Sequence, residues 1–117
     1  MHTLVRCNTL RDVDDAARSL SGWRQEYSQL GCGPYAGSVH SLALPQAEVF
    51  VESNNLALHQ SSEVPHNTVV LALALQAGGT GWIAGKTFDA NTMIVLGDGH
   101  ALDFRSPPQL TVAALVV

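Results

Sequence analysis

Short runs of β-favouring residues, separated by glycine and proline, most restrict what this chain can fold into. Two of them, YAGSVHSLAL and AEVFVES, meet at Pro45–Gln46 and predict a hairpin. Other runs end at AGGTG and SPP, which are typical turn or loop sequences. Runs of this length and spacing predict about eight or nine short strands in a sandwich or barrel.

The segment DVDDAARSLSGW, which precedes the predicted strands, is where the sequence predicts a helix. Asp12 or Asp14 would cap its N-terminus, Ala16 and Ala17 favour helix, and Gly22 would end it. The 117 residues suit a single domain, 1–117. The expected fold is mostly β with one N-terminal helix.

Three of the later runs carry more specific expectations. NTVVLALAL is apolar at successive positions, which predicts a strand buried on both faces. WIAG and KTFDA predict a short hairpin around Gly85–Lys86. TMIVL and HALDF are joined by GDG, which predicts another hairpin because glycine accepts positive φ without steric cost.

The composition is unusual for a free-standing domain. Hydrophobic residues make up 46% of the chain and charged residues 14%. We therefore expect a partner, or a missing part of the chain, to cover some of the surface. The net charge is −4, and beyond an N-terminal group of arginines the chain offers no cluster of cations for phosphate. By itself this domain is not expected to bind DNA.

The sequence predicts a cytoplasmic protein with no membrane segment. Its longest uninterrupted apolar run, 69–75, is too short to span a bilayer. The N-terminus lacks the pattern of a signal peptide. Two cysteines, Cys7 and Cys32, are expected to be free thiols.

The histidines do not form a recognisable metal motif. His40, His59, His66 and His100 are scattered, and the sequence contains no His-x-His, the spacing that directs two imidazoles to one face of a strand. We therefore expect no metal and no cofactor. The sequence also contains no Gly-x-Ser-x-Gly nucleophile elbow, and no catalytic residue is predicted.

A glutamate beside an aromatic residue is the stronger candidate for chemistry. Phe50 and Glu52 share one face of a predicted strand because side chains alternate along it. On a barrel wall this carboxyl would have a raised pKa and act as an acid or base, or it would hold a cationic or hydroxylated ligand. The open alternative is a glutamate that faces solvent, because ionisable residues are mostly exposed. Trp82 is predicted either to plug a barrel end or to form a ligand wall.

Three groups of residues resemble the N-terminal domain of AraC-type transcriptional regulators. The first is Trp23, Tyr27, Gln29 and Leu30, followed by Tyr35 and Gly37; the second is Glu52, Asn55, Ala57, Leu58, His59 and Gln60; the third is Leu102, Asp103, Phe104, Arg105, Ser106 and Pro107. The GCGPY loop departs from the family's usual small-Pro-Gly loop and leaves the effector open.

The resemblance implies a cupin-like jelly-roll or β-barrel that senses a small effector or mediates dimer contacts, with no catalytic role. DNA would be bound only through a C-terminal helix-turn-helix domain that this chain lacks. The expected partners are a small-molecule effector and, as an open alternative, a second copy of the chain. Glu52 and Asn55 would fix a strand and its corner or line the pocket mouth.

The ligand-binding residues expected on this basis are Phe50, Glu52, Asn55, His59, Trp82 and Phe104. An effector among them would act through its different affinity for two conformations. Two alternatives remain open at this point. One is a small cupin enzyme, an isomerase or a metal-dependent oxygenase, and the other is a dimerisation module that uses exposed apolar strands such as 110–117.

Overall fold

Two antiparallel sheets face each other in the computed structural model of the chain. It describes residues 4–10, 12–20, 23–97 and 101–117, and only the backbone of residues 4–9. The elements are β1 (Leu4–Leu10), α1 (Val13–Ala17), β2 (Arg24–Gln29), β3 (Gly37–Leu44), β4 (Ala47–Asn54), β5 (Leu58–Glu63), β6 (Val69–Gln76), β7 (Gly81–Ile83), β8 (Lys86–Phe88), β9 (Met93–Gly97), β10 (Ala101–Ser106) and β11 (Leu110–Val116).

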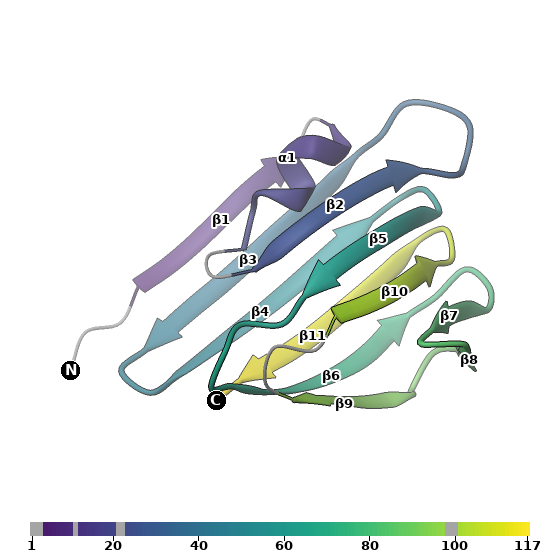
Figure 1. Ribbon diagram of the computed structural model, residues 1–117. Coiled ribbons are helices and arrows are strands. Elements are labelled where there is room, and N and C mark those ends of the chain that lie inside the picture. Colours follow the sequence, from purple (N-terminus) through teal and green to yellow (C-terminus); the bar gives the residue numbers. More distant parts are fainter. Residues whose placement is uncertain (1–3, 11, 21–22, 98–100) are drawn as a thin grey trace.

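The sheets differ in size and in the order of their strands. The six-stranded sheet has the order β1-β3-β4-β11-β6-β9, and the five-stranded sheet has the order β2-β5-β10-β7-β8. Figure 1 shows the smaller sheet lying in front of the larger one. Neighbouring strands are mostly distant in the chain, so the sheets are assembled by long-range pairing.

Two predicted hairpins are confirmed. β3 and β4 pair antiparallel up to Leu44 and Ala47, so Pro45–Gln46 forms a two-residue loop. β7 and β8 also pair antiparallel, and their loop is Ala84–Gly85. Both of these loop residues have positive φ, 49° and 79°, as a turn that matches the twist of the strands requires.

The third predicted hairpin is wrong. The strands before and after GDG, β9 and β10, lie in different sheets: β9 pairs with β6, whereas β10 pairs with β5 and β7. Residues 98–100 lie outside the described residues. The two strands join different sheets because they have separate partners, which the sequence of the turn does not specify.

The N-terminal region differs from the prediction in two ways. A strand, β1, precedes the helix and pairs with β3 at the edge of the larger sheet. The helix itself is one short turn, and Asp12 caps it by accepting a hydrogen bond from the Asp15 backbone N–H at 2.8 Å. Gly22, the predicted end of the helix, lies outside the described residues.

The expectation that β6 is buried on both faces is also wrong. Val70, Ala72 and Ala74 are buried between the sheets, whereas Val69 and Leu71 on the other face are exposed. Only one face of this strand is covered, because no layer packs on the outside of the larger sheet in the described residues.

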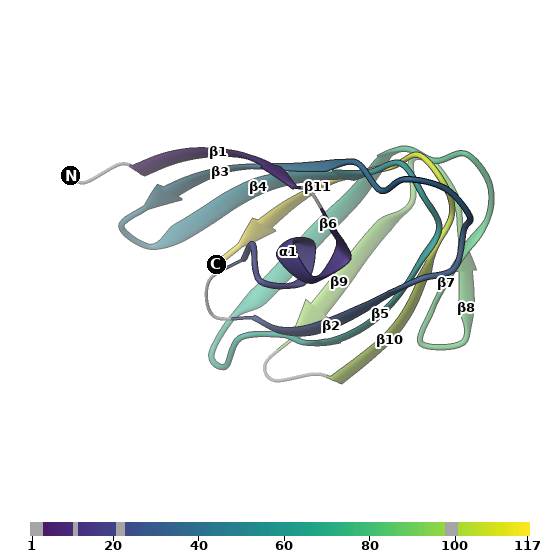
Figure 2. The ribbon, with the colours of Figure 1, turned by 90° about the horizontal axis from the view of Figure 1, so that it is seen from above.

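The hydrophobic core lies between the two sheets. Its most fully buried large side chains are Val39, Leu58, Val64, Val70 and Leu110. Figure 2 shows α1 lying between the layers, and it packs on β2 with its fully buried Ala16. A second cluster of Ala74, Phe88 and Leu110 extends the core.

Candidate functional site

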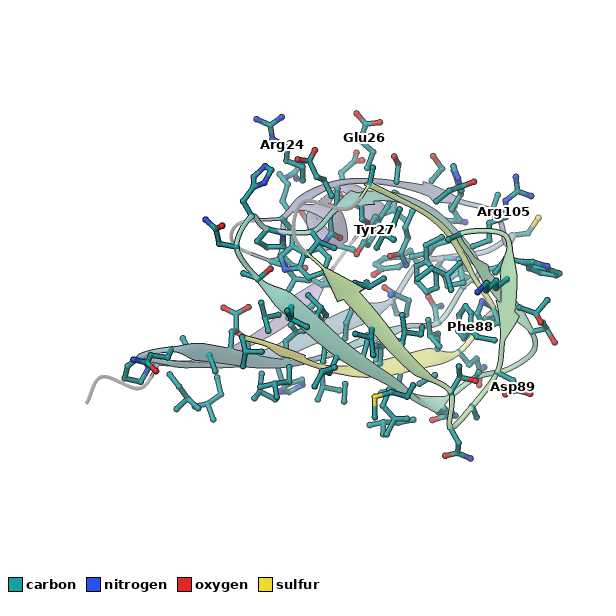
Figure 3. The ribbon with its side chains drawn as sticks, turned by 60° about the horizontal axis from the view of Figure 1, so that its bottom comes forward. Arg24, Glu26, Tyr27, Phe88, Asp89 and Arg105 are labelled. Atoms are coloured by element: carbon teal, nitrogen blue, oxygen red, sulfur yellow. The ribbon has the colours of Figure 1, made fainter. Side chains whose placement is uncertain are left out.

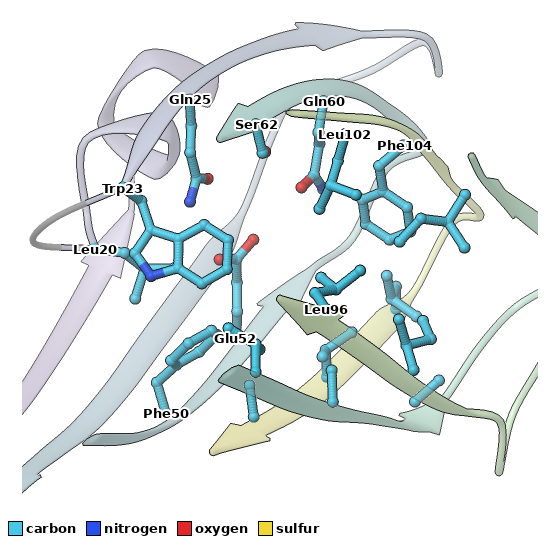
Figure 4. A pocket seen from close by; sticks show the side chains of 18 of the residues that line it. Leu20, Trp23, Gln25, Phe50, Glu52, Gln60, Ser62, Leu96, Leu102 and Phe104 are labelled. Atoms are coloured by element: carbon cyan, nitrogen blue, oxygen red, sulfur yellow. The ribbon is translucent and has the colours of Figure 1, made fainter. Parts of the chain in front are cut away.

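A cavity of about 90 Å³ lies between the sheets. Its walls are mostly apolar, and both sheets contribute to them (Figure 4). The apolar lining residues are Leu20, Trp23, Tyr27, Phe50, Val70, Ala72, Ala74, Ile83, Phe88, Ile94, Leu96, Leu102, Phe104, Leu110, Val112 and Ala114, and the polar ones are Gln25, Glu52, Asn54, Gln60 and Ser62.

Strand alternation directs the polar groups inwards. Phe50, Glu52 and Asn54 are every second residue of β4 and are buried, whereas the residues between them are only partly buried. Gln25 and Tyr27 lie two residues apart on β2 in the opposite sheet, and both line the cavity. The polar groups therefore approach one another from facing sheets.

A chain of hydrogen bonds joins these groups. The Tyr27 hydroxyl donates to Glu52 Oε1 at 3.1 Å and lies 3.4 Å from Oε2. The Asn54 Nδ2 donates to the same Oε1 at 3.0 Å, and the Tyr35 hydroxyl donates to Asn54 Oδ1. Glu52 Oε1 thus accepts two good hydrogen bonds, while among the described residues Oε2 has only the longer contact with Tyr27.

Burial controls the protonation of this cluster. Removal from water raises the pKa of Glu52 above its ordinary value, and the hydrogen bonds from Asn54 and Tyr27 oppose that rise without cancelling it. Burial, together with the nearby Glu52 carboxyl, also raises the pKa of the Tyr27 and Tyr35 hydroxyls. Glu52 therefore holds its proton more strongly than a glutamate in water.

One further polar atom at the cavity lacks a partner. Gln25 Oε1 is buried and has no hydrogen bond among the described residues. A buried acceptor without a partner costs free energy, so such a group calls for an explanation. Figure 4 shows Gln25 and Glu52 at the same side of the cavity. Together they present acceptor oxygens that a ligand donor would satisfy.

Aromatic side chains form two ends of the apolar wall. Trp23 meets Phe50 edge to face, with ring centroids 6.1 Å apart and planes at 89°. Phe88 stacks on Phe104 with centroids 5.3 Å apart. Trp23 was not among the predicted site residues, although it begins the first group of the family resemblance.

The structure brings three of the six predicted ligand residues together. Phe50, Glu52 and Phe104 all line the cavity. Asn55 does not line it and lies just beyond the end of β4 at Asn54. The Asn55 side chain instead accepts from the Ala36 N–H at 2.8 Å and donates to the Pro34 carbonyl at 3.0 Å, which fixes the loop before β3.

His59 and Trp82 also lie away from the cavity. His59 Nε2 is 2.5 Å from Asp103 Oδ1, and the two side chains are 37% and 69% exposed on the outside of the smaller sheet. Trp82 is 48% exposed on β7, opposite Arg105 of β10. Trp82 therefore does not form a wall of this cavity.

The sequence contained a signal for residues that the prediction missed. Alternation from Phe50 through Glu52 leads to Asn54 rather than Asn55. Tyr27 belongs to the family resemblance, but it contacts Glu52, which is 25 residues further along the chain, and this contact is not visible in the local sequence. Nothing in the local sequence of Gln25 marks it as a cavity residue.

The remaining candidates for chemistry do not converge. No three histidine, cysteine, aspartate or glutamate side chains lie close enough to hold a metal ion in the part of the chain that the structure describes. His100, one of the four histidines considered, lies outside that part. Within the same residues, no helix is long and apolar enough to cross a membrane.

Comparison with solved structures identifies the fold. An RmlC-like cupin from Shewanella frigidimarina matches with a TM-score of 0.53 and 8% identity, over 79% of this chain and 82% of that one. A protein from Salmonella typhimurium, provisionally described as ethanolamine utilization protein Q, matches with a TM-score of 0.50 and 11% identity, over 69% and 68%. No protein-family model matches the chain.

These matches correct one expectation and leave another as a proposal. The prediction that the chain is not an enzyme is wrong. It relied on the regulator resemblance, whereas the two proteins that share this fold are named as an RmlC-like cupin and as an ethanolamine utilization protein. Neither protein is described as a regulator, so the AraC-type context is not shown. What the architecture and the matches establish is a mostly β, cupin-like barrel.

Proposed function

We propose that this chain binds a small, mainly apolar molecule that carries a hydroxyl or an ammonium group. The observation that supports this proposal is the buried Glu52 carboxyl in the wall of a mostly apolar cavity. Glu52 Oε2 and Gln25 Oε1 have acceptor capacity to spare. A hydroxyl or ammonium group on the ligand would donate to one or both of these oxygens, and the aromatic walls would hold its apolar part.

The size of the cavity limits the ligand. At about 90 Å³ it is smaller than the roughly 300–1,000 Å³ of sites for drug-sized molecules. The ligand class is therefore a branched or cyclic alcohol or amine of few carbon atoms. An ammonium group would favour the ionised form of Glu52, because an opposite charge lowers the pKa of a carboxyl.

We further propose that ligand binding in this barrel regulates an attached DNA-binding domain, as in AraC-type regulators. The resemblance supports this, since Tyr27 and Glu52, from two of its three groups, contact each other at the cavity. DNA binding by the full-length native protein that changes on ligand addition would support the proposal. Native protein that binds no DNA with or without ligand would contradict it.

The binding proposal is tested with a matched set of probes. The probes are 3-methylbutan-1-ol, 3-methylbutylamine and the apolar analogue 2-methylpentane, added to the purified chain and followed by NMR titration and thermal unfolding. We expect the alcohol or the amine to bind and to raise the Tm, with shifts at residues that line the cavity. The alkane should bind more weakly, because it leaves the acceptors unpaired.

Two variants make the test specific. Glu52→Gln removes the charge inside the cavity and should weaken amine binding by about tenfold or more, the usual effect of losing a charged hydrogen bond. Glu26→Gln makes the same change on an exposed residue of β2 and should leave binding unchanged. Equal binding by wild type and Glu52→Gln, or no binding of any probe, would contradict the proposal.

The same carboxyl supports a second candidate, an isomerase. A buried glutamate with a raised pKa is suited to accept and return a proton, and Tyr27 lies beside it as a hydrogen-bond donor. The expected reaction is proton removal from a carbon next to a carbonyl, followed by its return to another atom. The observation that favours this candidate is the combination of burial and position in the cavity.

Exchange with deuterated water tests the isomerase candidate. Small ketones and aldehydes of the same size are incubated with the chain in D₂O, and NMR measures loss of the proton next to the carbonyl. Exchange that wild type accelerates and Glu52→Gln does not would support it. Exchange at the same rate with both proteins would show that Glu52 is not the base.

A further inference from the structure

Three aromatic rings line the cavity together with the Glu52 carboxyl: Trp23, Tyr27 and Phe50. The Trp23 and Phe50 rings meet with their centroids 6.1 Å apart, and the Tyr27 hydroxyl lies 3.1 Å from Glu52 Oε1. Figure 4 shows Trp23 and Phe50 on the same side of the cavity as Glu52. These contacts hold the rings and the carboxyl in one group that spans both sheets. We call the three rings the aromatic cage.

The Glu52 carboxyl has no positively charged neighbour in the cavity. None of the described residues that line it is a lysine, arginine or histidine. Arg24 and Arg105 are exposed, and Figure 3 shows both directed away from the interior, where Tyr27 lies. A buried carboxylate without a cation beside it is costly, because its charge loses the hydration it had in water. A cationic ligand would supply the partner charge that the described part of the chain does not provide.

The hydrogen-bonding capacity left open beside the aromatic cage is that of acceptors. Among the described residues, Glu52 Oε2 has only the 3.4 Å contact with Tyr27, and Gln25 Oε1 has no partner. A primary ammonium group brings three donors and no acceptor, so it can donate to both oxygens. A hydroxyl has one donor and can satisfy only one of them. The open acceptors therefore fit an ammonium better than an alcohol.

Aromatic faces add a preference for positive charge. The face of a ring is electrostatically negative, and a cation within about 6 Å of the ring centroid is attracted to it, most strongly by tryptophan. The attraction grows when the cation is removed from water, as it would be in this cavity. At about 90 Å³, the cavity suits a nitrogen that carries only a compact alkyl group.

We infer that the ligand of this cavity is a compact alkylammonium ion, which donates to Glu52 and Gln25 and packs its alkyl group against the aromatic cage. The inference rests on the proposed function and narrows it, because it selects the ammonium over the hydroxyl. It also gives Trp23 a role in specificity. The Trp23 ring would favour a cation over a neutral molecule of the same shape, whereas an aliphatic side chain there would not.

Three probes of similar shape separate charge from hydrogen bonding. tert-Butylamine, which is protonated at neutral pH, has both a charge and N–H donors; tetramethylammonium has only the charge; tert-butanol has only a hydroxyl. NMR titration of the purified chain measures the affinity of each. We expect tert-butylammonium to bind about tenfold or more tightly than tert-butanol, the usual effect of a charged hydrogen bond. The indole N–H signal of Trp23 should shift, while that of the exposed Trp82 should not.

A matched pair of tryptophan variants tests the aromatic cage. Trp23→Leu keeps an apolar side chain but removes the ring, and it should weaken both cations by about threefold or more while changing tert-butanol binding by less than about twofold. Trp82→Leu makes the same change at an exposed position outside the cavity and should leave all three affinities unchanged. Circular dichroism checks that both variants are folded. If Trp23→Leu is unfolded, the order of affinities for wild type and the shift of the Trp23 indole signal decide the question.

The outcomes distinguish this inference from the proposed function. tert-Butanol that binds wild type as tightly as tert-butylammonium overturns the inference and leaves the proposed function standing. The same holds if 3-methylbutan-1-ol binds and both cations fail to bind. If no alcohol and no amine binds, the inference and the proposed function both fail. A preference for cations that is unchanged in folded Trp23→Leu overturns the part assigned to the aromatic cage.

Discussion

Glu52 is where burial and hydrogen bonding compete most directly. Burial opposes its ionisation, while donors from Tyr27 and Asn54 favour the carboxylate. The balance leaves the pKa of Glu52 raised. The folded protein therefore retains a proton that the unfolded chain releases at lower pH.

This balance predicts how stability depends on pH. The pKa of Glu52 is higher in the folded state than in the unfolded chain. The contribution of Glu52 to the free energy of unfolding is therefore complete below the unfolded pKa of about 4.3, and it is lost as the pH rises through the folded pKa. Glu52→Gln does not titrate, so the variant should gain stability relative to wild type as the pH rises from acid to neutral. Urea unfolding at a series of pH values measures this difference.

The control is again Glu26→Gln, on the exposed face of β2. It should follow wild type across the same pH range. A difference between Glu52→Gln and wild type that stays constant with pH would contradict the assignment of a raised pKa to Glu52.

At the scale of elements, close contact between β7, β8 and β10 depends on one glycine. A Cβ on Gly81 would lie 2.4 Å from two ring atoms of Phe88 and 2.9 Å from the Arg105 carbonyl oxygen. Phe88 is buried and stacks on Phe104, so it cannot move away without disturbing the core. The absence of a side chain at Gly81 therefore permits this strand packing.

Gly81→Ala should lower the free energy of unfolding by about 1–3 kcal/mol, the usual cost of overpacking. Gly97→Ala is the matched change, because a Cβ there meets nothing within 4 Å among the described residues. Thermal or denaturant unfolding of the two variants measures the contrast. Equal stability of the two would show that the β7–β8 hairpin adjusts at no cost.

At the scale of the whole molecule, the two sheets are held together by the side chains between them. Leu58 is fully buried on β5, whereas Leu30, just after β2, is 55% exposed. Leu58→Ala should cost about 2–5 kcal/mol, because it removes buried methyl groups and leaves a cavity. Leu30→Ala should change stability by less than about 0.5 kcal/mol.

Denaturant unfolding at neutral pH compares these two variants with wild type. A loss at Leu30→Ala as large as that at Leu58→Ala would mean that the surface near β2 is covered in solution. The same measurement would then have to be repeated at different protein concentrations, since association stabilises the folded state.

The sequence by itself determined the fold class and the approximate strands. Turn residues at Pro45–Gln46 and Gly85 indicated two hairpins that the structure confirms. Alternation along β4 also placed Phe50 and Glu52 on one face, and both line the cavity. These features are local, because a turn residue or a period of two acts within a few positions of the chain.

Only the tertiary structure decided which strands pair and what the inner face contains. β9 and β10 join different sheets, β1 pairs with a strand beyond the helix, and Tyr27 reaches Glu52 across the barrel. Likewise, the sequence of β6 is almost entirely apolar, and only its alternating burial in the structure shows that half of its side chains face outwards. Each of these is a contact between distant segments, and its free energy depends on neighbours that local sequence does not specify.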